Sequence, residues 1–231
     1  MTDVAPAKQG DTLVGTTAAE CAALTDAMAS MHATFWDDAD APALAGFPRW
    51  TGEVPGRKVA EALPKFVAEW GGRLPPAAID AATRLPELFP VAVEALLRAP
   101  PTLVHTDLHL DNVLFLADGT PVILDWPDAR RGPAALDFAR LLVDHMTSAA
   151  RRERQERLVL RYRAALASRG VDYDIERLRG DVASAVTIVY AAVVRWAGGP
   201  DALEPDLPRV PLIVESVVRS AADAATDPPC A

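Results

Sequence analysis

The side chains best suited to chemistry are concentrated in one segment, LVHTDLHLDNVLFLADGTPVILDW, which runs from residue 103 to residue 126. The polar residues of interest in it are His105, Asp107, His109, Asp111, Asn112 and Asp125. Imidazole, carboxylate and amide groups can bind a metal ion, and a carboxylate can also accept the proton of a substrate hydroxyl. The segment therefore points to one of two kinds of chemistry, metal-dependent hydrolysis or phosphoryl transfer.

Metal-dependent hydrolysis follows if the start of the segment is a single extended strand. The two-residue period of a strand would place His105, Asp107, His109 and Asp111 on the same face. Such ligands suit zinc, manganese or iron. The chain has only four histidines, and the other two lie in helical patterns without neighbouring ligands. A metallohydrolase that uses His105, Asp107 and His109 therefore stands as an alternative.

Phosphoryl transfer follows if the segment is a loop and then a hairpin. Asn112 comes five residues after Asp107, and Asp125 lies at the far end of the hairpin, which returns the chain toward its start. Transfer from a nucleoside triphosphate needs a carboxylate that accepts the proton of the acceptor hydroxyl, and oxygen ligands for Mg²⁺. Asp107 suits the first role, and Asn112 with Asp125 suits the second.

The elements that must position these residues are mostly helices, interrupted by proline and glycine. The predicted hairpin covers Asn112 to Trp126, because NVLFL and PVILDW are short apolar runs rich in β-branched residues and ADG supplies a turn. The predicted helices cover residues 18–36, 57–70, shorter pieces of 75–98 broken at Pro86 and Pro90, 132–146, 151–168, 175–197 and 210–225. The fold class is therefore α+β, mainly helical.

For three of these helices the sequence also predicts a cap, a solvent-exposed face or burial. The first is capped by Thr16 or Thr17 and presents one apolar face, made of Cys21, Leu24, Met28, Met31 and Phe35. The arginine-rich run 151–163 is interpreted as a solvated helix face. The apolar run VASAVTIVYAAVV is too short for a membrane span and predicts a buried helix.

Composition limits the classes of partner. The formal charge of −9 disfavours binding to nucleic acid and to anionic lipid. Two cysteines, Cys21 and Cys230, suggest neither a disulfide framework nor a thiolate metal site. The first residues have no basic start followed by an apolar block, so we expect no secretion signal and a cytoplasmic location.

Four stretches together resemble a known family. HTDLHLDN resembles the H-x-D-x-x-x-x-N catalytic loop of the aminoglycoside phosphotransferase and choline kinase group, and VILDW resembles the metal-binding aspartate segment of that group. AAECAALTDAMASMHATFW is similar to the helix with a late histidine that follows the hinge of these kinases, and RGPAALDFARLL to their helix with a bracing aspartate. The resemblance implies the C-terminal lobe of a protein-kinase-like fold.

The resemblance also implies roles for individual residues. Asp107 would be the catalytic base, Asn112 and Asp125 the Mg²⁺ ligands, and His105 and Asp137 the supports of the loop, with ATP as co-substrate. We interpret His109 as a loop side chain hydrogen-bonded to backbone, and Asp111 as a turn or capping residue. Pro127 departs from the acidic residue that many relatives carry there, and Asp128 follows it.

A β-rich lobe that grips the nucleotide is missing from this sequence. Such a lobe should supply a Gly-rich loop and a strand lysine paired with a helix glutamate. No Gly-rich segment precedes the first helix, and the three lysines, Lys8, Lys58 and Lys65, lie in the opening linker and in a helical stretch. The expected domains are a hinge remnant at 1–15, a helical catalytic lobe at 16–226 and a tail at 227–231.

Three explanations for the missing lobe remain open. Met1 is an internal methionine of a longer kinase, or the chain is a short, non-catalytic helical binding module, or a separate chain supplies the lobe. We expect weak or no activity from the 231 residues alone, and an exposed apolar face that favours dimerisation. The acceptor is expected to be a small-molecule alcohol or amino alcohol. Acidic residues that could hold a cationic acceptor are Asp37, Asp38, Asp40, Asp172, Asp174 and Glu176.

Overall fold

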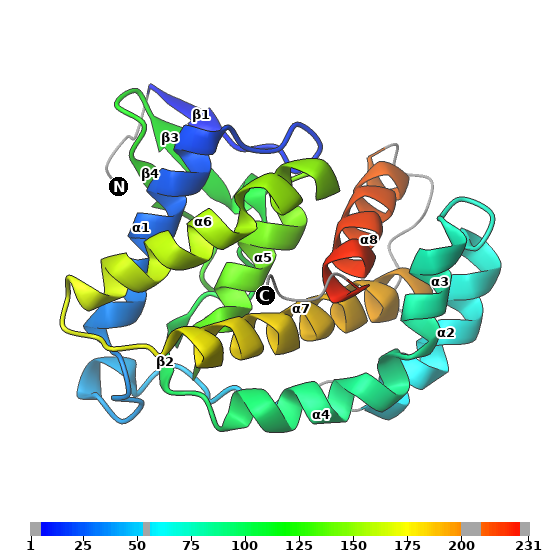
Figure 1. Ribbon diagram of the computed structural model, residues 1–231, viewed down its shortest axis with the longest axis horizontal. Coiled ribbons are helices and arrows are strands. Elements are labelled where there is room, and N and C mark those ends of the chain that lie inside the picture. The colour runs from blue at the N-terminus through cyan, green and yellow to red at the C-terminus, as the bar shows by residue number, and fades with distance from the viewer. Residues whose placement is uncertain (1–5, 53–55, 200–208, 227–231) are drawn as a thin grey trace.

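Helices form most of the chain in the computed structural model, which describes residues 6–52, 56–199 and 209–226 (Figure 1). The helices are α1 Ala18–Thr34, α2 Gly56–Trp70, α3 Pro76–Thr83, α4 Leu85–Leu97, α5 Ala135–Asp144, α6 Ser148–Ala167, α7 Ile175–Gly198 and α8 Val210–Thr226, with 3₁₀ turns η1 Pro42–Leu44 and η2 Leu110–Asn112. The strands are β1 Ala7–Gln9, β2 Pro101–Val104, β3 Val113–Leu116, β4 Pro121–Ile123 and β5 Arg130–Pro133. The predicted mainly helical α+β class is confirmed.

Helix α7 is the centre of the helical packing. It lies against α2, α4, α5 and α8, and its buried side chains include Val186, Val189 and Tyr190. By length and composition alone α7 could cross a membrane, but 56% of the apolar window is buried inside the protein, which is the setting of a core helix. The prediction of a buried helix here is confirmed.

The start of α1 agrees with the sequence, but its buried face is rotated from the expected one. Thr17 is the N-cap and forms a capping box with Glu20. The expected face included Met31 and Phe35, which are only partly buried. The residues that α1 buries are Cys21, Leu24, Thr25, Met28, Ala29 and His32. A buried histidine in this row needs hydrogen-bond partners, and they lie near the loop 105–112.

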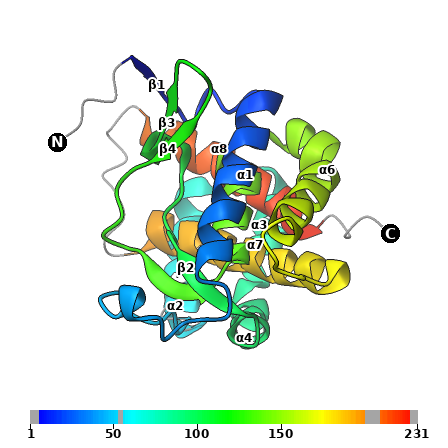
Figure 2. The same cartoon turned by 90° about the vertical axis from the view of Figure 1, so that its left-hand side faces the viewer.

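The predicted hairpin is present and belongs to a three-stranded sheet. β3 and β4 are antiparallel, with Val113 opposite Ile123. β1 joins the outer edge of β3, so part of the expected linker is a strand. Gly10 after β1 approaches the loop closely, because a Cβ there would lie 2.3 Å from the Leu110 carbonyl oxygen. The sheet and the α2 and α3 helices lie at opposite sides of the molecule (Figures 1 and 2).

A second, two-stranded sheet positions the segment between the hairpin and the helices. β2 pairs antiparallel with β5, with Leu103 opposite Arg131. β2 ends at Val104, and β5 leads directly into α5. The loop 105–112 therefore starts beside the first turn of α5, which is where a residue of α5 can hold it.

Two helical expectations were wrong in detail. Pro90 lies inside α4 and does not end it. Its missing N–H removes one hydrogen bond of the helix, but burial of the face containing Leu85, Phe89 and Leu96 outweighs that loss. Arg151 of the arginine-rich run is only 1% exposed, and it pairs with Asp223 of α8 at 3.0 Å. The calls on Met1, on Cys230 and on the tail 227–231 lie outside the described residues.

Candidate active site

The loop that follows β2 is strained and held by one carboxylate. Thr106 has φ of +66°, an unfavourable conformation for a β-branched residue. The backbone N–H groups of His105 and Thr106 donate to the two oxygens of Asp137, each at 2.8 Å. The Thr106 hydroxyl also donates to the Asp128 carbonyl at 2.8 Å. The carboxylate of Asp137 thus fixes the backbone immediately before Asp107.

Asp137 is itself held by a buried chain of polar groups. His32 Nε2 lies 3.2 Å from an Asp137 oxygen, and both side chains are fully buried. The Tyr162 hydroxyl donates to His32 Nδ1 at 2.6 Å. Burial raises the pKa of Tyr162 well above its ordinary value, so the hydroxyl keeps its proton and remains a donor. The buried carboxylate therefore accepts from three donors and leaves no buried charge unsatisfied.

His105 connects the loop to the end of the hairpin. Its Nε2 donates to the Leu124 carbonyl at 2.7 Å, and its ring packs edge-on against Trp126 at 4.9 Å. The Leu124 N–H donates to the Asn112 carbonyl at 2.9 Å. The backbone just before Asp125 is therefore fixed from two sides, by His105 and by Asn112.

Asp107 stands on the open side of the loop with few competing contacts. Its side chain is 41% exposed, and the Arg140 guanidinium and the His109 imidazole each lie 3.6 Å from it. Arg140 also binds Asp144 at 2.8 Å. Burial alone would lower the pKa of Arg140, but the carboxylates of Asp144 and Asp107 together raise it, so the guanidinium stays charged. A permanent cation therefore lies beside the Asp107 carboxylate.

Asn112 is oriented by its own amide nitrogen. Nδ2 donates to the Asp107 carbonyl at 3.1 Å and lies 3.1 Å from His109 Nε2. Within the described residues the amide oxygen has no hydrogen bond. His109 was expected to bond to backbone, and that expectation was wrong, since its ring instead contacts side chains on both sides. An oriented, free amide oxygen is a suitable ligand for Mg²⁺.

Asp125 combines strain with an unpaired charge. Its φ is +60°, which costs a non-glycine residue about 1–2 kcal/mol. The side chain is exposed, and no hydrogen bond or ion pair reaches it within the described part of the chain. Asn112 and Asp125 together offer two oxygen donors beside the anchored Leu124 backbone. This donor set fits Mg²⁺, which takes one or two protein oxygens and completes its shell with phosphate and water.

The alternative site of His105, Asp107 and His109 is not formed. Among the described residues no three His, Cys, Asp or Glu side chains are placed to hold a metal ion. The reason is that the strand ends at Val104, so the two-residue alternation does not continue. His105 instead lies fully buried and His109 lies partly exposed.

Asp111 joins the loop to the segment after β1. Its carboxylate accepts from the Thr12 hydroxyl at 2.6 Å, and its carbonyl accepts from the Gln9 amide at 3.0 Å. Arg209 lies 3.6 Å from it. Of the expected turn or capping role, the turn is present, because Asp111 lies inside η2, but capping is not, because the N-cap residue of η2 is His109 and η2 has no side-chain cap.

A cleft of about 590 Å³ opens in front of the loop and extends to α7 and α8. Its polar lining consists of Thr12, Thr106, Asp107, His109, Asp111, Asp128, Arg140, Asp144 and Arg195. Neither Asn112 nor Asp125 lines it. The cleft therefore brings together the proposed base and several further carboxylates, and the two proposed Mg²⁺ ligands lie outside its lining.

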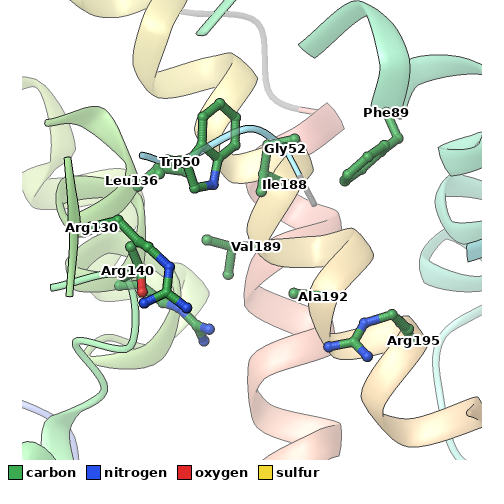
Figure 3. Close-up of a pocket in the computed structure, with 11 residues that line it drawn as sticks. Trp50, Gly52, Phe89, Arg130, Leu136, Arg140, Ile188, Val189, Ala192 and Arg195 are labelled. Atoms are coloured by element: carbon green, nitrogen blue, oxygen red, sulfur yellow. The ribbon is translucent and has the colours of Figure 1, made fainter. Parts of the chain in front are cut away.

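A smaller pocket of about 220 Å³ adjoins the cleft and shares Thr106, Arg140, Ala192 and Arg195 with it. Figure 3 shows Trp50, Phe89 and Ile188 around its apolar part. Sequence reasoning missed this pocket. A signal did exist for Arg195, which is the single charge in the apolar run VTIVYAAVVRW.

The acidic residues proposed to hold a cationic acceptor line neither cavity. Asp40 pairs with Arg49 at 2.5 Å, and Asp174 caps α7 by accepting from the Arg177 N–H at 2.8 Å. Glu176 pairs with Arg179. These groups act as surface ion pairs and caps, so that proposal is not supported.

Comparison with known proteins gives a family and supports the fold. A family model described as "Phosphotransferase enzyme family" matches residues 4–180. No curated protein sequence gives a significant match. Among solved structures, a choline kinase, LicA, from Streptococcus pneumoniae superposes with a TM-score of 0.52 at 13% identity, covering 96% of this chain and 68% of that one.

Two further structures share the fold. A macrolide 2′-phosphotransferase type I has a TM-score of 0.50 and 19% identity over 90% of this chain. An aminoglycoside phosphotransferase from Alicyclobacillus acidocaldarius has a TM-score of 0.52 and 15% identity over 94% of this chain and 66% of its own. The 231 residues span only 58% of the macrolide enzyme.

Proposed function

Because the chain belongs to the phosphotransferase enzyme family, we propose that it transfers the γ-phosphoryl group of ATP to a hydroxyl group of a small molecule. The observation that carries the proposal is Asp107. Its carboxylate is 41% exposed, it lines the larger cleft, and the backbone before it is fixed by Asp137. A fixed carboxylate at an open cleft can take the proton of an acceptor hydroxyl as the hydroxyl attacks phosphorus.

The other residues of the loop would position the reaction. Asn112 and Asp125 would hold Mg²⁺, which neutralises the charge on the nucleotide phosphates when it is bound. His105 and Asp137 keep the loop in its strained form through hydrogen bonds of 2.7–2.8 Å. Arg140 lies 3.6 Å from Asp107 and would help to hold that carboxylate at the cleft.

The described residues contain no strand lysine that could serve the nucleotide phosphates. Lys8 on β1 pairs with Glu20 at 2.8 Å, but Glu20 belongs to the capping box of α1. Neighbouring side chains of a strand point to opposite faces. Since Gln9 faces Asp111, Lys8 faces away from the cleft. We therefore propose residues 16–226 as the helical catalytic lobe, 1–15 as the segment that leads into it and 227–231 as a tail.

Activity of the 231 residues alone should accordingly be weak. Positioning and charge stabilisation supply most of the acceleration in phosphoryl transfer, and a general base adds only about 10²–10⁴-fold. A nucleotide-gripping lobe from a longer reading frame or from a separate chain would supply the rest. Exposed large apolar side chains occur on the loop after β1 and on α4, α6 and α8, so the described surface shows no single apolar face for docking.

The test compares ATP-dependent phosphorylation of a panel of alcohols by the 231-residue chain and by a longer product of the same reading frame. We expect turnover chiefly from the longer form. Asp107→Asn should lower kcat by about 10²–10⁴-fold without changing the melting temperature. Asp172→Asn is the matched control, because Asp172 is 96% exposed. Equal activity of Asp107→Asn and wild type would refute the proposed base, and a complete lack of turnover would favour a non-catalytic module.

A further inference from the structure

The two adjoining cavities carry opposite charges. The larger cleft is lined by four carboxylates, those of Asp107, Asp111, Asp128 and Asp144, and by two guanidinium groups. The smaller pocket is lined by three arginines, Arg130, Arg140 and Arg195, and by no acidic residue. An acceptor that fits the smaller pocket therefore meets positive charge, in contrast to the cationic acceptor that the sequence suggested.

Arg195 is the decisive group in this pocket. Its Nε is buried without a hydrogen-bond partner, as is the Nε of Arg179. Unlike Arg179, whose terminal nitrogens bind carboxylates, Arg195 has no hydrogen bond or ion pair at any side-chain nitrogen within the described part of the chain. Figure 3 shows its guanidinium directed from α7 toward the side of the pocket where Arg130 and Arg140 lie. A cation in the last turn of α7 is favoured by the helix dipole. That effect does not require a partly buried guanidinium with no partner at all, which costs free energy until an anion binds.

The other two arginines have partners, which lie toward the larger cleft. Arg140 binds Asp144 at 2.8 Å and lies 3.6 Å from Asp107. Arg130 lies 3.6 Å from Asp128. Their carboxylate partners line the larger cleft and not the smaller pocket. The positive charge left for a ligand in the small pocket thus comes mainly from Arg195, with Arg130 and Arg140 opposite it.

The rest of the pocket is apolar and rigid. Trp50, Phe89, Leu136 and Ile188 contribute to its lining. The backbone N–H of Trp50 donates to the Arg131 carbonyl at 2.9 Å, which fixes the backbone at Trp50 beside β5. A Cβ at Gly132 would lie 2.8 Å from Trp50 Cβ, so glycine is needed there for this wall. A volume of about 220 Å³ suits a compact body such as one aromatic ring.

Thr106 lines both cavities and is the residue before Asp107. A ligand whose apolar body fills the small pocket would therefore present its hydroxyl group near the proposed base. From these contacts we propose that the acceptor is a compact alcohol that carries a carboxylate, with the carboxylate bound by Arg195 and the apolar body against Trp50 and Phe89. Arginine binds a carboxylate through two parallel N–H donors, which gives the site its preference for this group. The assignment of an acceptor rests on the proposed phosphotransferase function, whereas the binding of the carboxylate does not.

The test measures binding to the 231-residue chain by calorimetry without ATP or metal. The probes are 3-phenyllactate and phenylalaninol, which share a ring and a hydroxyl but carry opposite charges. We expect saturable binding of phenyllactate at millimolar concentration, with phenylalaninol at least tenfold weaker. Arg195→Gln should weaken phenyllactate about tenfold or more, and Arg195→Lys should weaken it less.

Arg179→Gln is the matched control, because Arg179 lies on the same helix, pairs with Glu156 and Glu176, and lines neither cavity. It makes the same change in charge and should leave binding unchanged. Arg195→Gln should also keep or raise the melting temperature of the free protein, because an unpaired half-buried charge destabilises the fold.

Any one of three results would overturn the proposed binding of the carboxylate, and a fourth would reassign the pocket. The three are no phenyllactate binding, equal binding of phenylalaninol, or equal effects of the Arg179 and Arg195 substitutions. If inorganic phosphate displaces phenyllactate and binds more tightly, the pocket holds a phosphoryl group and the carboxylate assignment is wrong. Binding as expected without phosphorylation of phenyllactate by an active longer form would remove the acceptor role and leave the anion site.

Discussion

The two sides of the catalytic loop are built differently. On the inner side, His32, His105, Asp137 and Tyr162 are fully buried and joined to each other or to backbone by hydrogen bonds of 2.6–3.2 Å. On the outer side, Asp107, His109 and Asp111 have side chains 32–41% exposed, and the His109 ring nitrogens lie 3.6–3.7 Å from the two carboxylates.

The difference shows how the loop separates rigidity from reactivity. The inner side holds the strained Thr106 backbone, so the position of Asp107 does not depend on contacts that Asp107 itself makes. A proton-accepting carboxylate must keep its lone pairs free and still be held in place, and support from behind the loop satisfies both needs. Substitutions on the inner side should therefore lower stability and activity together, and those on the outer side should affect activity alone.

The largest effect is expected from Asp137→Asn. The amide keeps one acceptor oxygen, but its NH₂ group would face a backbone N–H of the loop in place of the second oxygen. Leaving buried donors unpaired should lower the free energy of unfolding by about 3–5 kcal/mol, measured by urea denaturation. Turnover by the longer form should fall as well, because Asp107 loses its fixed position.

A graded variant separates the brace from a general loss of packing. Tyr162→Phe keeps the ring and removes only the donor to His32 Nδ1, so its cost should be about 1–2 kcal/mol. A loss for Asp137→Asn no greater than that for Tyr162→Phe would contradict the view that the carboxylate holds the loop.

The second effect concerns pH and His145, which lies behind the loop. Its Nε2 donates to the Leu108 carbonyl at 2.8 Å. Burial lowers its pKa from 6.5 to about 4, although the nearby Asp144 carboxylate acts in the opposite direction. Below pH 6.5 the unfolded chain binds a proton at this histidine that the folded chain does not bind. Stability should therefore be complete above pH 6.5 and fall by roughly 3 kcal/mol between pH 6.5 and 4.

His145→Gln checks this expectation, because glutamine retains an N–H donor but does not titrate. The variant should be less stable than wild type at pH 7, yet its free energy of unfolding should change less between pH 6.5 and 4. Parallel stability profiles for the two proteins, measured by urea denaturation, would show that His145 is not responsible for the loss.

The sequence predicted what depends on local pattern. The spacing of apolar residues predicted α7 and α8 closely, and the hairpin followed from two β-branched runs with a turn between them. The resemblance of short motifs assigned the bracing role to Asp137, and the contacts of Asp137 support that role. β1 was missed, because three residues are too few to give a strand signal, and they become a strand only by pairing with β3.

Contacts between distant segments could not be predicted in this way. His32 and Tyr162 are 130 residues apart, and nothing in either helix indicates that the two side chains meet. The small pocket likewise depends on how α4, α5, α7 and the Trp50 segment come together. A lone arginine in an apolar run shows that a charge must be accommodated, but only the packing shows that it faces a pocket.

The smallest effect is expected from His109→Ala, on the outer side of the loop. Its ring is 35% exposed and contacts Asn112, which keeps its other hydrogen bond, to the Asp107 carbonyl. The free energy of unfolding should change by less than about 0.5 kcal/mol, and turnover should fall less than in Asp107→Asn.

The variant also tests the metallohydrolase alternative, because a zinc site that used His109 would lose its metal. Zinc retained through dialysis by wild type and released by His109→Ala would overturn the phosphotransferase assignment of the loop. Equal, negligible zinc content in both proteins would remove the metallohydrolase alternative, and unchanged stability with lower turnover would show that the outer side carries function without supporting the fold.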